Sequence, residues 1–282
     1  MPAADRASLL APARIHLTYL WRHRRRLRLG NPRLFTEWVQ HRKLFDRDWR
    51  LPPLADKVAV KRHVADRLGA EWVIPTLWHG DALPVQPPAA LPLVVKARHG
   101  CKQIAFVHDL DDWAAARRRA RRWTRRRYGY WLDEWAYAHI PRGLLIEPYL
   151  GERDVLPVDY KLMVFGGRVE FVEVHRGRDT ADHRWVFLDR DWARVSAATD
   201  DPDPVRPATL DRMITAAESL AQGHAFIRAD FYEIAGRPLF GELTHYPGSG
   251  LHAVRPTALD RRMGDLWARA RAGLAAQHRD GR

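Results

Sequence analysis

The sequence predicts an α+β fold in which β-hairpins alternate with helices. Hydrophobic residues make up 46% of the 282 residues, which is enough to build a packed core and excludes a wholly disordered chain. Residues 160–175 form an apolar run interrupted by Gly166-Gly167, a pair typical of a two-residue hairpin turn. Apolar residues at helical spacing follow between Pro207 and Gly223. Hairpins interleaved with helices favour an α+β fold over a doubly wound parallel sheet.

Charge and composition exclude several classes of protein. The chain carries 47 basic and 34 acidic side chains, a formal net charge of +13. Its single cysteine, Cys101, can form neither an internal disulfide nor a multi-thiolate zinc site. No apolar run approaches the ~20 residues of a membrane-spanning helix, and the N-terminus lacks the apolar segment of a secretory signal. We therefore expect a soluble, cytoplasmic protein without a transmembrane segment.

Arginines gather in two stretches, residues 22–28 and 117–127. Such clusters attract polyanions such as nucleic acid, anionic lipid or an acidic polymer, although a solvated helix face explains the second cluster equally well. The first cluster follows apolar residues from Leu9 to Trp21. Residues 1–30 are therefore expected to form a basic amphipathic extension that lies either on the inner face of the membrane or on the protein's own body. Nucleic acid is the less expected partner, because the second cluster offers no evident aromatic stacking platform.

The middle of the chain is punctuated by proline, glycine and aspartate, which delimit its elements. In chain order we expect a helix over 54–68, a proline-rich connector and candidate domain boundary over 84–92, strands over 93–95 and 104–107 around the loop 99–102, a helix capped by Asp111 or Asp112 that runs to about Arg127, and a buried strand over 144–146.

The most informative segment is residues 225–244, in which two strands alternate in chemistry. One face carries Arg228 and Asp230 on the first strand and, on the second, Phe240, Glu242 and Thr244. If residues 235–237 form a three-residue loop, Asp230 lies opposite Glu242 and Arg228 opposite Thr244. A two-residue turn would send Glu242 to the apolar face, so the three-residue loop is preferred.

Two carboxylates directly opposed across a hairpin repel each other, with Cβ atoms about 4.5–5.5 Å apart. A divalent cation resolves the conflict, because Mg²⁺ commonly takes one or two carboxylates plus substrate phosphates. Asp230 and Glu242 are therefore candidate metal ligands, and Arg228 adds a donor for an anionic ligand. A solvent-exposed hairpin with incidental acids is the alternative. The turn Tyr246–Gly250 that follows offers backbone N–H groups to an anion.

Short motifs run through the chain in a recognisable order. They are Phe35-Thr36-Glu37 with Leu44–Asp48, Leu54-Ala55-Asp56-Lys57, Val94-Val95-Lys96 with His99-Gly100, Glu147–Leu150, Asp159-Tyr160-Lys161, Phe165-Gly166-Gly167, Arg228–Tyr232 and Phe240–Gly248. This series resembles the ATP-grasp superfamily, and most closely its TupA-like branch, named for a protein of cell-wall polymer biosynthesis. The resemblance covers about residues 33 to 267.

The resemblance implies an ATP-grasp fold, with two α+β subdomains that clamp a nucleotide behind a reduced N-terminal domain. That reduced domain would span residues 31–90, after the basic extension of residues 1–30. Residues 91–155 would form the small lid subdomain, and residues 156–282 the large catalytic subdomain.

The resemblance also implies roles for the residues that match its motifs. Catalytic roles fall on Lys96, on Arg228 near the transferred phosphoryl group and, for the acceptor, on Arg176 with Arg178 beside it. ATP would be bound by Lys57, Lys96, Glu147, Tyr149, Leu150, Asp159 and Lys161. Mg²⁺, or Mn²⁺ in its place, would be held by Asp230, Glu242 and Thr244. Thr244 stands where many ATP-grasp enzymes have asparagine, and the loop 99–102 holds fewer small residues than is usual, so metal and phosphate contacts there are thinner.

The implied activity is that of an ATP-dependent carboxylate-amine ligase with an acyl-phosphate intermediate, in polysaccharide or cell-envelope polymer biosynthesis. Its partners would be the nucleotide and a small-molecule or acidic polymer acceptor. Two alternatives stay open: a phosphotransferase that uses the same site on a hydroxyl acceptor, and a non-enzymatic protein that binds polyanions or a membrane surface through its arginines.

Overall fold

The structure is a computed structural model, and it describes residues 10–125, 128–129, 131–152, 155–177, 184–199 and 202–280. Its helices are α1 (Ala11–His23), α2 (Phe35–Phe45), α3 (Leu51–Ala55), α4 (Ala59–Leu68), α5 (Leu110–Arg125), α6 (Trp135–Ala138), α7 (Leu210–Leu220) and α8 (Thr257–Asp280), with short 3₁₀ turns η1 (Ala70–Trp72) and η2 (Pro247–Gly250). Its strands are β1 (Trp78–Gly80), β2 (Leu93–Ala97), β3 (Ile104–Val107), β4 (Leu144–Pro148), β5 (Asp159–Phe165), β6 (Arg168–Arg176), β7 (Arg184–Asp189), β8 (Phe226–Ile234) and β9 (Arg237–Thr244).

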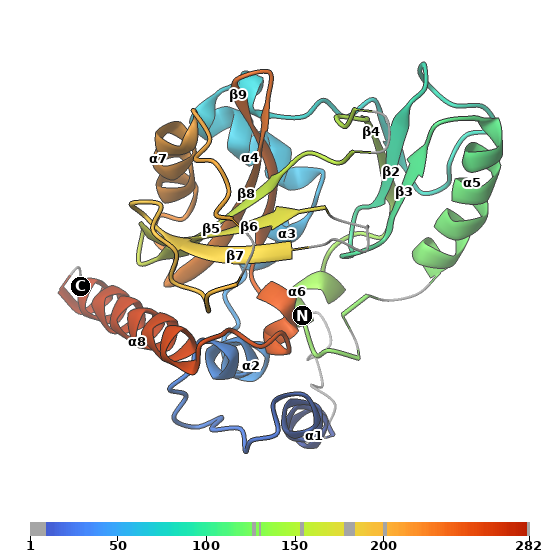
Figure 1. The fold of residues 1–282 in the computed structure, drawn as a ribbon. Helices are drawn as coiled ribbons and strands as arrows, with labels where there is room; N and C mark the ends of the chain where they lie inside the picture. The colour runs from blue at the N-terminus through green and yellow to red at the C-terminus, as the bar shows by residue number, and fades with distance from the viewer. Residues whose placement is uncertain are drawn as a thin grey trace.

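The strands form two antiparallel sheets, which confirms the predicted α+β class. The small sheet has the order β1-β4-β2-β3, and the large sheet has the order β7-β6-β5-β8-β9. Figure 1 shows the small sheet with α5 on its outer side, and the large sheet between α7 and the pair α2 and α8. The four-part division of the chain into domains stays a prediction.

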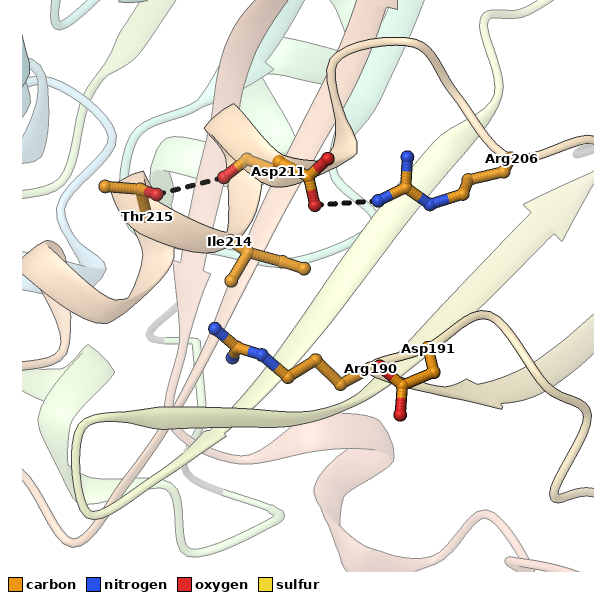
Figure 2. A pocket seen from close by; sticks show the side chains of 6 residues that line it. All are labelled: Arg190, Asp191, Arg206, Asp211, Ile214 and Thr215. Atoms are coloured by element: carbon orange, nitrogen blue, oxygen red, sulfur yellow. Dashed lines mark hydrogen bonds and ion pairs between the residues drawn. The ribbon is translucent and has the colours of Figure 1, made fainter.

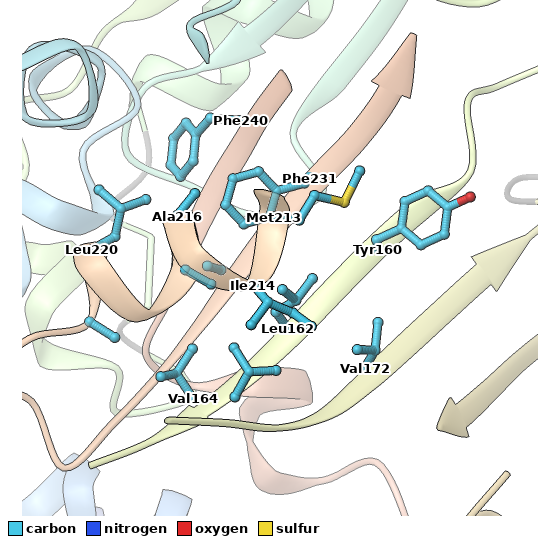
Figure 3. Close-up of a cluster of buried hydrophobic side chains, with 14 of the residues drawn as sticks. Tyr160, Leu162, Val164, Val172, Met213, Ile214, Ala216, Leu220, Phe231 and Phe240 are labelled. Atoms are coloured by element: carbon cyan, nitrogen blue, oxygen red, sulfur yellow. The ribbon is translucent and has the colours of Figure 1, made fainter. Parts of the chain in front are cut away.

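One face of the large sheet carries the largest cluster of buried apolar side chains, part of which Figure 3 shows. Leu162 and Val164 of β5 point into this cluster together with Ile227 of β8, because alternate residues of a strand face the same side. Helix α7 covers the cluster through residues at helical spacing, Leu210, Met213, Ile214, Ala217 and Leu220. Burial of each such leucine or isoleucine stabilises the fold by about 1.5–3 kcal/mol.

The opposite face of the large sheet is apolar at one end only. Here Phe226 of β8 stacks on Trp267 of α8, with ring centroids 4.4 Å apart, and Phe35 of α2 packs edge-on against Phe226 at 5.1 Å. The sequence prediction did not include α8, whose fully buried residues Met263 and Trp267 complete this cluster. The other end of the same face carries charged side chains.

The small sheet packs against α5. Trp113, Ala116 and Ala120 lie on one side of this helix and are buried against the sheet. The predicted helix was placed correctly, but the backbone N–H of Asp112 donates to Asp109 at 2.8 Å, so Asp109 caps the first turn rather than Asp111 or Asp112. The described part of the helix ends at Arg125, and the two arginines beyond it lie outside the described residues.

The predicted single helix over residues 54–68 was wrong, because the chain leaves the helical path at Asp56. A carboxylate oxygen of Asp56 accepts hydrogen bonds from the backbone N–H groups of Val58 and Ala59, at 2.9 and 3.3 Å, which starts α4 afresh. The other partner of Asp56 is the guanidinium of Arg98, in a two-bond contact at 2.5 and 2.7 Å. The break therefore turns Asp56 and Lys57 toward the small sheet.

Candidate active site

Four charged residues lie in register across the polar end of the large sheet. Glu173 on β6 is the Cα partner of Lys161 on β5, Lys161 is the partner of Asp230 on β8, and Asp230 is the partner of Glu242 on β9. Directly opposed residues of neighbouring antiparallel strands project from the same face. We call Glu173, Lys161, Asp230 and Glu242 the polar row.

The predicted pairing of Asp230 with Glu242 and of Arg228 with Thr244 is confirmed, but the predicted turn was wrong. The turn has two residues, because Ile234 pairs with Arg237. A bulge beyond Phe231 and Phe240 then restores the register, with Gly241 as the extra residue. Phe240 accordingly lies opposite Phe231 in the apolar cluster, not beside Glu242 as predicted.

A second bulge aligns Glu173 with the row. The Gly166-Gly167 turn is present as predicted, and Phe165 pairs with Arg168 across it. Continued without interruption, that register would set Lys161 opposite Val172. The irregularity between Met163 and Val164 sets it opposite Glu173 instead. Sequence reasoning missed Glu173; the alternation Val-Glu-Val-His from Val172 to His175 was the signal, but it could not reveal the bulge.

Asp230 is almost fully buried and lies between two cations. The Arg228 guanidinium donates to both of its carboxylate oxygens, at 2.7 and 2.6 Å, and the Lys161 ammonium donates at 2.7 Å. Burial opposes charge on Arg228, but the neighbouring Asp230 outweighs it and raises the pKa of the guanidinium above its ordinary value. We call Asp230, Lys161 and Arg228 the Asp230 cluster.

Glu242 is the most exposed member of the polar row, with 32% of its side chain accessible. One of its oxygens lies 3.7 Å from the Lys57 ammonium, and the other accepts from the Thr244 hydroxyl at 3.3 Å. Burial is the largest single influence on Glu242 and raises its pKa, but Lys57, Arg228 and Lys161 together outweigh it, and the net pKa lies below the ordinary value. Lys57 also donates to the Gly100 carbonyl at 2.9 Å, so it links the loop of the small sheet to the large sheet.

Lys96 and Glu147 meet on the small sheet. The Lys96 ammonium lies 2.5 Å from one oxygen of Glu147, and the Lys61 ammonium lies 2.5 Å from the other. Burial favours the neutral acid, but the two lysines outweigh it and hold the pKa of Glu147 below its ordinary value. We call Glu147, Lys61 and Lys96 the Glu147 cluster. Sequence reasoning missed Lys61, because a lysine on α4 gives no signal that it reaches another sheet.

Two further residues predicted to bind ATP, Tyr149 and Leu150, follow Glu147 in the chain. The backbone N–H of Tyr149 donates to the Pro92 carbonyl at 3.3 Å, and the Tyr149 ring packs edge-on against Phe106 and His108, with centroids 5.8 and 5.1 Å away. Leu150 follows and is half-buried. These residues stand at the end of β4, next to the Glu147 cluster.

Asp159 adjoins the Asp230 cluster, since its carboxylate contacts the Lys161 ammonium at 2.5 Å. Arg176, the acceptor candidate, ends β6 and is the register partner of Arg184 on β7; it directly follows His175, the partner of Asp159. Arg178 lies outside the described residues. The structure therefore brings seven predicted residues together at the polar end of the large sheet and four on the small sheet. The first set is Lys57, Asp159, Lys161, Arg228, Asp230, Glu242 and Thr244, and the second is Lys96, Glu147, Tyr149 and Leu150.

The donor set of the polar row suits a hard cation. Asp230 and Glu242 present carboxylate oxygens from adjacent strands, and Mg²⁺ binds such pairs with substrate phosphates as its remaining ligands. Within the described residues no group of three or more His, Cys, Asp or Glu side chains could hold a metal ion by itself. A metal site here would therefore depend on phosphate ligands, with Thr244 already hydrogen-bonded to Arg228 at 3.1 Å.

The turn after β9 is held from behind by a buried lysine. Gly248, Ser249 and Gly250 all adopt positive φ, between 52° and 64°, and Lys43 donates to the Ser249 carbonyl and hydroxyl at 2.8 and 2.7 Å. Burial lowers the pKa of Lys43 to about 8. Burial raises the pKa of the Cys101 thiol, whose sulfur lies 3.1 Å from the Tyr137 hydroxyl, and so disfavours the reactive thiolate.

A pocket of about 340 Å³ lies elsewhere, between α7 and the turn after β7 (Figure 2). It is lined by Arg190, Asp191, Arg206, Asp211, Ile214 and Thr215. Arg206 contacts Asp211 at 2.7 Å, and Arg190 contacts Glu218, so both basic side chains are already paired. The lining includes none of the predicted site residues, and we assign the pocket no chemistry.

A protein-family model described as TupA-like ATPgrasp matches residues 37–268. The chain belongs to this family. No curated protein matches the chain in sequence.

Several solved structures resemble the fold at low sequence identity. The D-alanine–D-alanine ligase from Bacillus anthracis is 13% identical, with a TM-score of 0.49 over 79% of this chain and 69% of that one. The L-amino acid ligase from Bacillus licheniformis is 13% identical, with a TM-score of 0.45 over 76% and 45%. The ATP-grasp ligase PsnB, in a complex with a precursor variant, Mg and ADP, is 13% identical, with a TM-score of 0.44 over 80% and 60%.

Proposed function

We propose that this chain is an ATP-dependent carboxylate-amine ligase that works through an acyl phosphate, in the biosynthesis of a polysaccharide or cell-envelope polymer. Membership of the TupA-like ATP-grasp family supports ATP as the nucleotide substrate, and one observation supports the position of the active site. The polar row sets two carboxylates, Asp230 and Glu242, beside the cations Arg228 and Lys57 at the polar end of the large sheet. Such a set can bind a metal triphosphate and stabilise charge on a transferred phosphoryl group.

In the proposed first step, an oxygen of the substrate carboxylate attacks the γ-phosphorus of ATP. The new O–P bond forms as the bond from the γ-phosphorus to the bridging oxygen breaks, and ADP leaves. In the second step an amine nitrogen attacks the acyl carbon, the C–N bond forms, and inorganic phosphate leaves with the electron pair of the broken C–O bond. The amine gives up one proton, and no side-chain nucleophile is needed.

The protein's residues would position charge rather than form bonds. Lys96 and Lys57 would neutralise phosphate oxygens, and Arg228, fixed by two hydrogen bonds to Asp230, would face the developing charge without rearranging. Mg²⁺, held by Glu242 and Asp230, would supply charge neutralisation on the phosphates when bound. Tyr149 and Leu150 would provide backbone contacts for the adenine.

The test is an ADP-release screen with Mg²⁺ and ATP across amino acids, uronic acids and phosphorylated sugars, with the products identified by mass spectrometry. An amide together with ADP and phosphate is the expected result, and its loss in Asp230→Asn and Glu242→Gln assigns the site. Nucleotide turnover that survives both substitutions would place catalysis elsewhere. A phosphorylated acceptor without phosphate release would replace the ligase by a phosphotransferase at the same site.

A further inference from the structure

Helix α1 exposes a row of large apolar side chains. Leu10, Leu17, Leu20 and Trp21 are 68%, 67%, 46% and 67% accessible. Leu10 precedes Leu17 by seven positions, and Leu20 and Trp21 follow Leu17 by three and four, so all four side chains lie on one side of the helix. We call these four residues the α1 patch. In Figure 1, α1 lies at the outer edge of the molecule, with α2 between it and the large sheet.

The other side of α1 is fixed to the protein. Ile15 and Tyr19 are fully buried, and the Tyr19 hydroxyl lies 3.1 Å from the Thr36 hydroxyl on α2. Arg25, just beyond the helix, contacts the buried Asp260 at 2.7 Å. Because these contacts hold the inner side, the helix cannot roll to hide the α1 patch without breaking them.

Three exposed arginines directly follow helix α1 in the chain. Arg24, Arg26 and Arg28 are exposed, and within the part of the chain that the structure describes their side chains make no hydrogen bond or ion pair. A further exposed aromatic residue, Trp131, adjoins the helix, with the Arg14 guanidinium 5.7 Å from its ring centroid and the Trp131 side chain 69% accessible. The surface thus combines leucine, tryptophan and uncompensated positive charge.

The second arginine cluster differs. On α5, Arg118, Arg119, Arg121 and Arg122 are exposed, but the apolar residues Trp113, Ala116 and Ala120 are buried against the small sheet. This helix therefore offers charge without an apolar surface to insert. Binding in the plane of a bilayer needs both.

We propose that the α1 patch, with Arg24, Arg26 and Arg28, docks the protein on the surface of a bilayer that contains anionic lipid. Leucine and tryptophan would enter the boundary between headgroups and acyl chains, and the arginines would meet lipid phosphates. A bilayer fits better than a second copy of the chain, because two such patches would bring like charges together on a chain of net charge +13. Among the helices that the structure describes, none combines the length and apolar character that a bilayer crossing requires, so the contact would be peripheral.

The test is flotation of the full chain with vesicles of phosphatidylcholine alone and of phosphatidylcholine mixed with phosphatidylglycerol. We expect binding to the mixed vesicles only, weakened at high salt. Leu17→Glu with Trp21→Glu should lower the partition coefficient by at least about tenfold. Arg26→Gln with Arg28→Gln should lower it by about fivefold for each arginine removed.

Matched variants separate the α1 patch from net charge and from general exposure. Leu110→Glu with Val205→Glu changes two residues that are 63% and 88% accessible and adds the same charge, and Arg118→Gln with Arg119→Gln removes the same charge from α5. Both pairs should bind vesicles within about twofold of the wild type. All variants alter exposed side chains, so their Tm should stay within about 2 °C.

Three results would overturn the proposal. The first is that the wild type does not bind anionic vesicles. The second is that Arg118→Gln with Arg119→Gln weakens binding as much as Arg26→Gln with Arg28→Gln. The third is that light scattering shows a dimer that Leu17→Glu with Trp21→Glu converts to a monomer, which would assign the α1 patch to a second copy of the chain. None of these results depends on ligase activity.

Discussion

Asp230 in the large sheet and Glu147 in the small sheet are both buried carboxylates held between two cations. The partners of Asp230 lie in its own sheet, Lys161 on β5 and Arg228 on β8. The partners of Glu147 come from two bodies. Lys96 is on the neighbouring strand β2, whereas Lys61 is on α4, which packs into the core of the large sheet.

The Asp230 cluster is therefore held within one sheet, whereas the geometry of the Glu147 cluster depends on two parts of the molecule. Strand register fixes all three groups of the Asp230 cluster, so they are positioned before a ligand arrives. The Glu147 cluster also depends on how α4 and the small sheet sit together. A triphosphate that draws Lys96 away would leave Glu147 paired with Lys61, so the carboxylate would not be left alone. The cost of removing a partner should therefore be greater at Asp230.

The largest effect is expected from Asp230→Asn. Loss of the carboxylate leaves Arg228 and Lys161 buried without their shared counter-ion, which should cost about 3–5 kcal/mol of unfolding free energy. It should also lower kcat/KM by about 10²–10³-fold, because the guanidinium is no longer held in place. The control is Asp260→Asn, which removes an equally buried carboxylate from Arg25, away from the site. The Asp260→Asn variant should lose unfolding free energy with little change in kcat/KM. If both variants lost the same amount of activity, Asp230 would contribute to activity only by stabilising the fold.

Acid titration tests whether the charge of Glu173 is stabilised by its neighbours in and around the polar row. Burial alone would raise the pKa of Glu173, but His175, Arg228 and Lys161 lower it to about 2. A carboxylate with a depressed folded pKa stabilises the fold above its unfolded pKa and loses that effect as the pH falls toward 2. The fall from 4.5 corresponds to at most about 3 kcal/mol.

We therefore expect the wild type to exceed Glu173→Gln in urea stability at pH 6, and the gap to close between about pH 4.5 and 2. Glu170→Gln, on the same strand, pairs only with the exposed Arg168 and should change stability by less than about 1 kcal/mol. A gap that is constant with pH would mean that these neighbours do not stabilise the charge of Glu173.

Substitution of the two lysines separates the halves of the Glu147 cluster. Lys96→Met should raise the KM for ATP by about 10–100-fold, because the ammonium is proposed to contact phosphate. Lys61→Met should mainly lower the unfolding free energy, since Lys61 also donates to the Ile74 carbonyl and the Thr76 hydroxyl, both at 2.7 Å. Steady-state kinetics and urea titration on both variants make the comparison. If instead Lys61→Met raised the KM for ATP and Lys96→Met only lowered the unfolding free energy, Lys61 would be the phosphate ligand.

The smallest effect is expected at the bulge that aligns the polar row. A Cβ on Gly241 would lie 3.1 Å from the Asp230 carbonyl oxygen and 3.2 Å from the Tyr232 ring, so Gly241→Ala should cost about 1–2 kcal/mol and lower kcat/KM. Gly273→Ala, on α8, meets nothing within 4 Å and should stabilise the protein by up to about 1 kcal/mol. Equal effects of the two substitutions would show that the bulge tolerates a side chain.

Much of this fold was accessible from local pattern. Hairpins at Gly166-Gly167 and around residues 99–102, the strand over 144–146 and the amphipathic helix after Pro207 each carry their own punctuation and spacing. The pairing of Asp230 with Glu242 was also predicted, because a carboxylate among isoleucine and leucine would be costly. The predicted three-residue turn was wrong, because the sequence pattern does not reveal the bulge at Gly241 that shifts the register by one residue.

The sequence by itself determined the α+β class, the family and the pairing of Asp230 with Glu242, because strand alternation and motif order can be read from residues that lie close together in the chain. Only the tertiary structure decided that Glu173 joins the polar row, that Lys61 reaches Glu147, and that Lys57 links the two sheets. These contacts join residues far apart in the chain, and they depend on bulges and helix placement that packing selects for the chain as a whole.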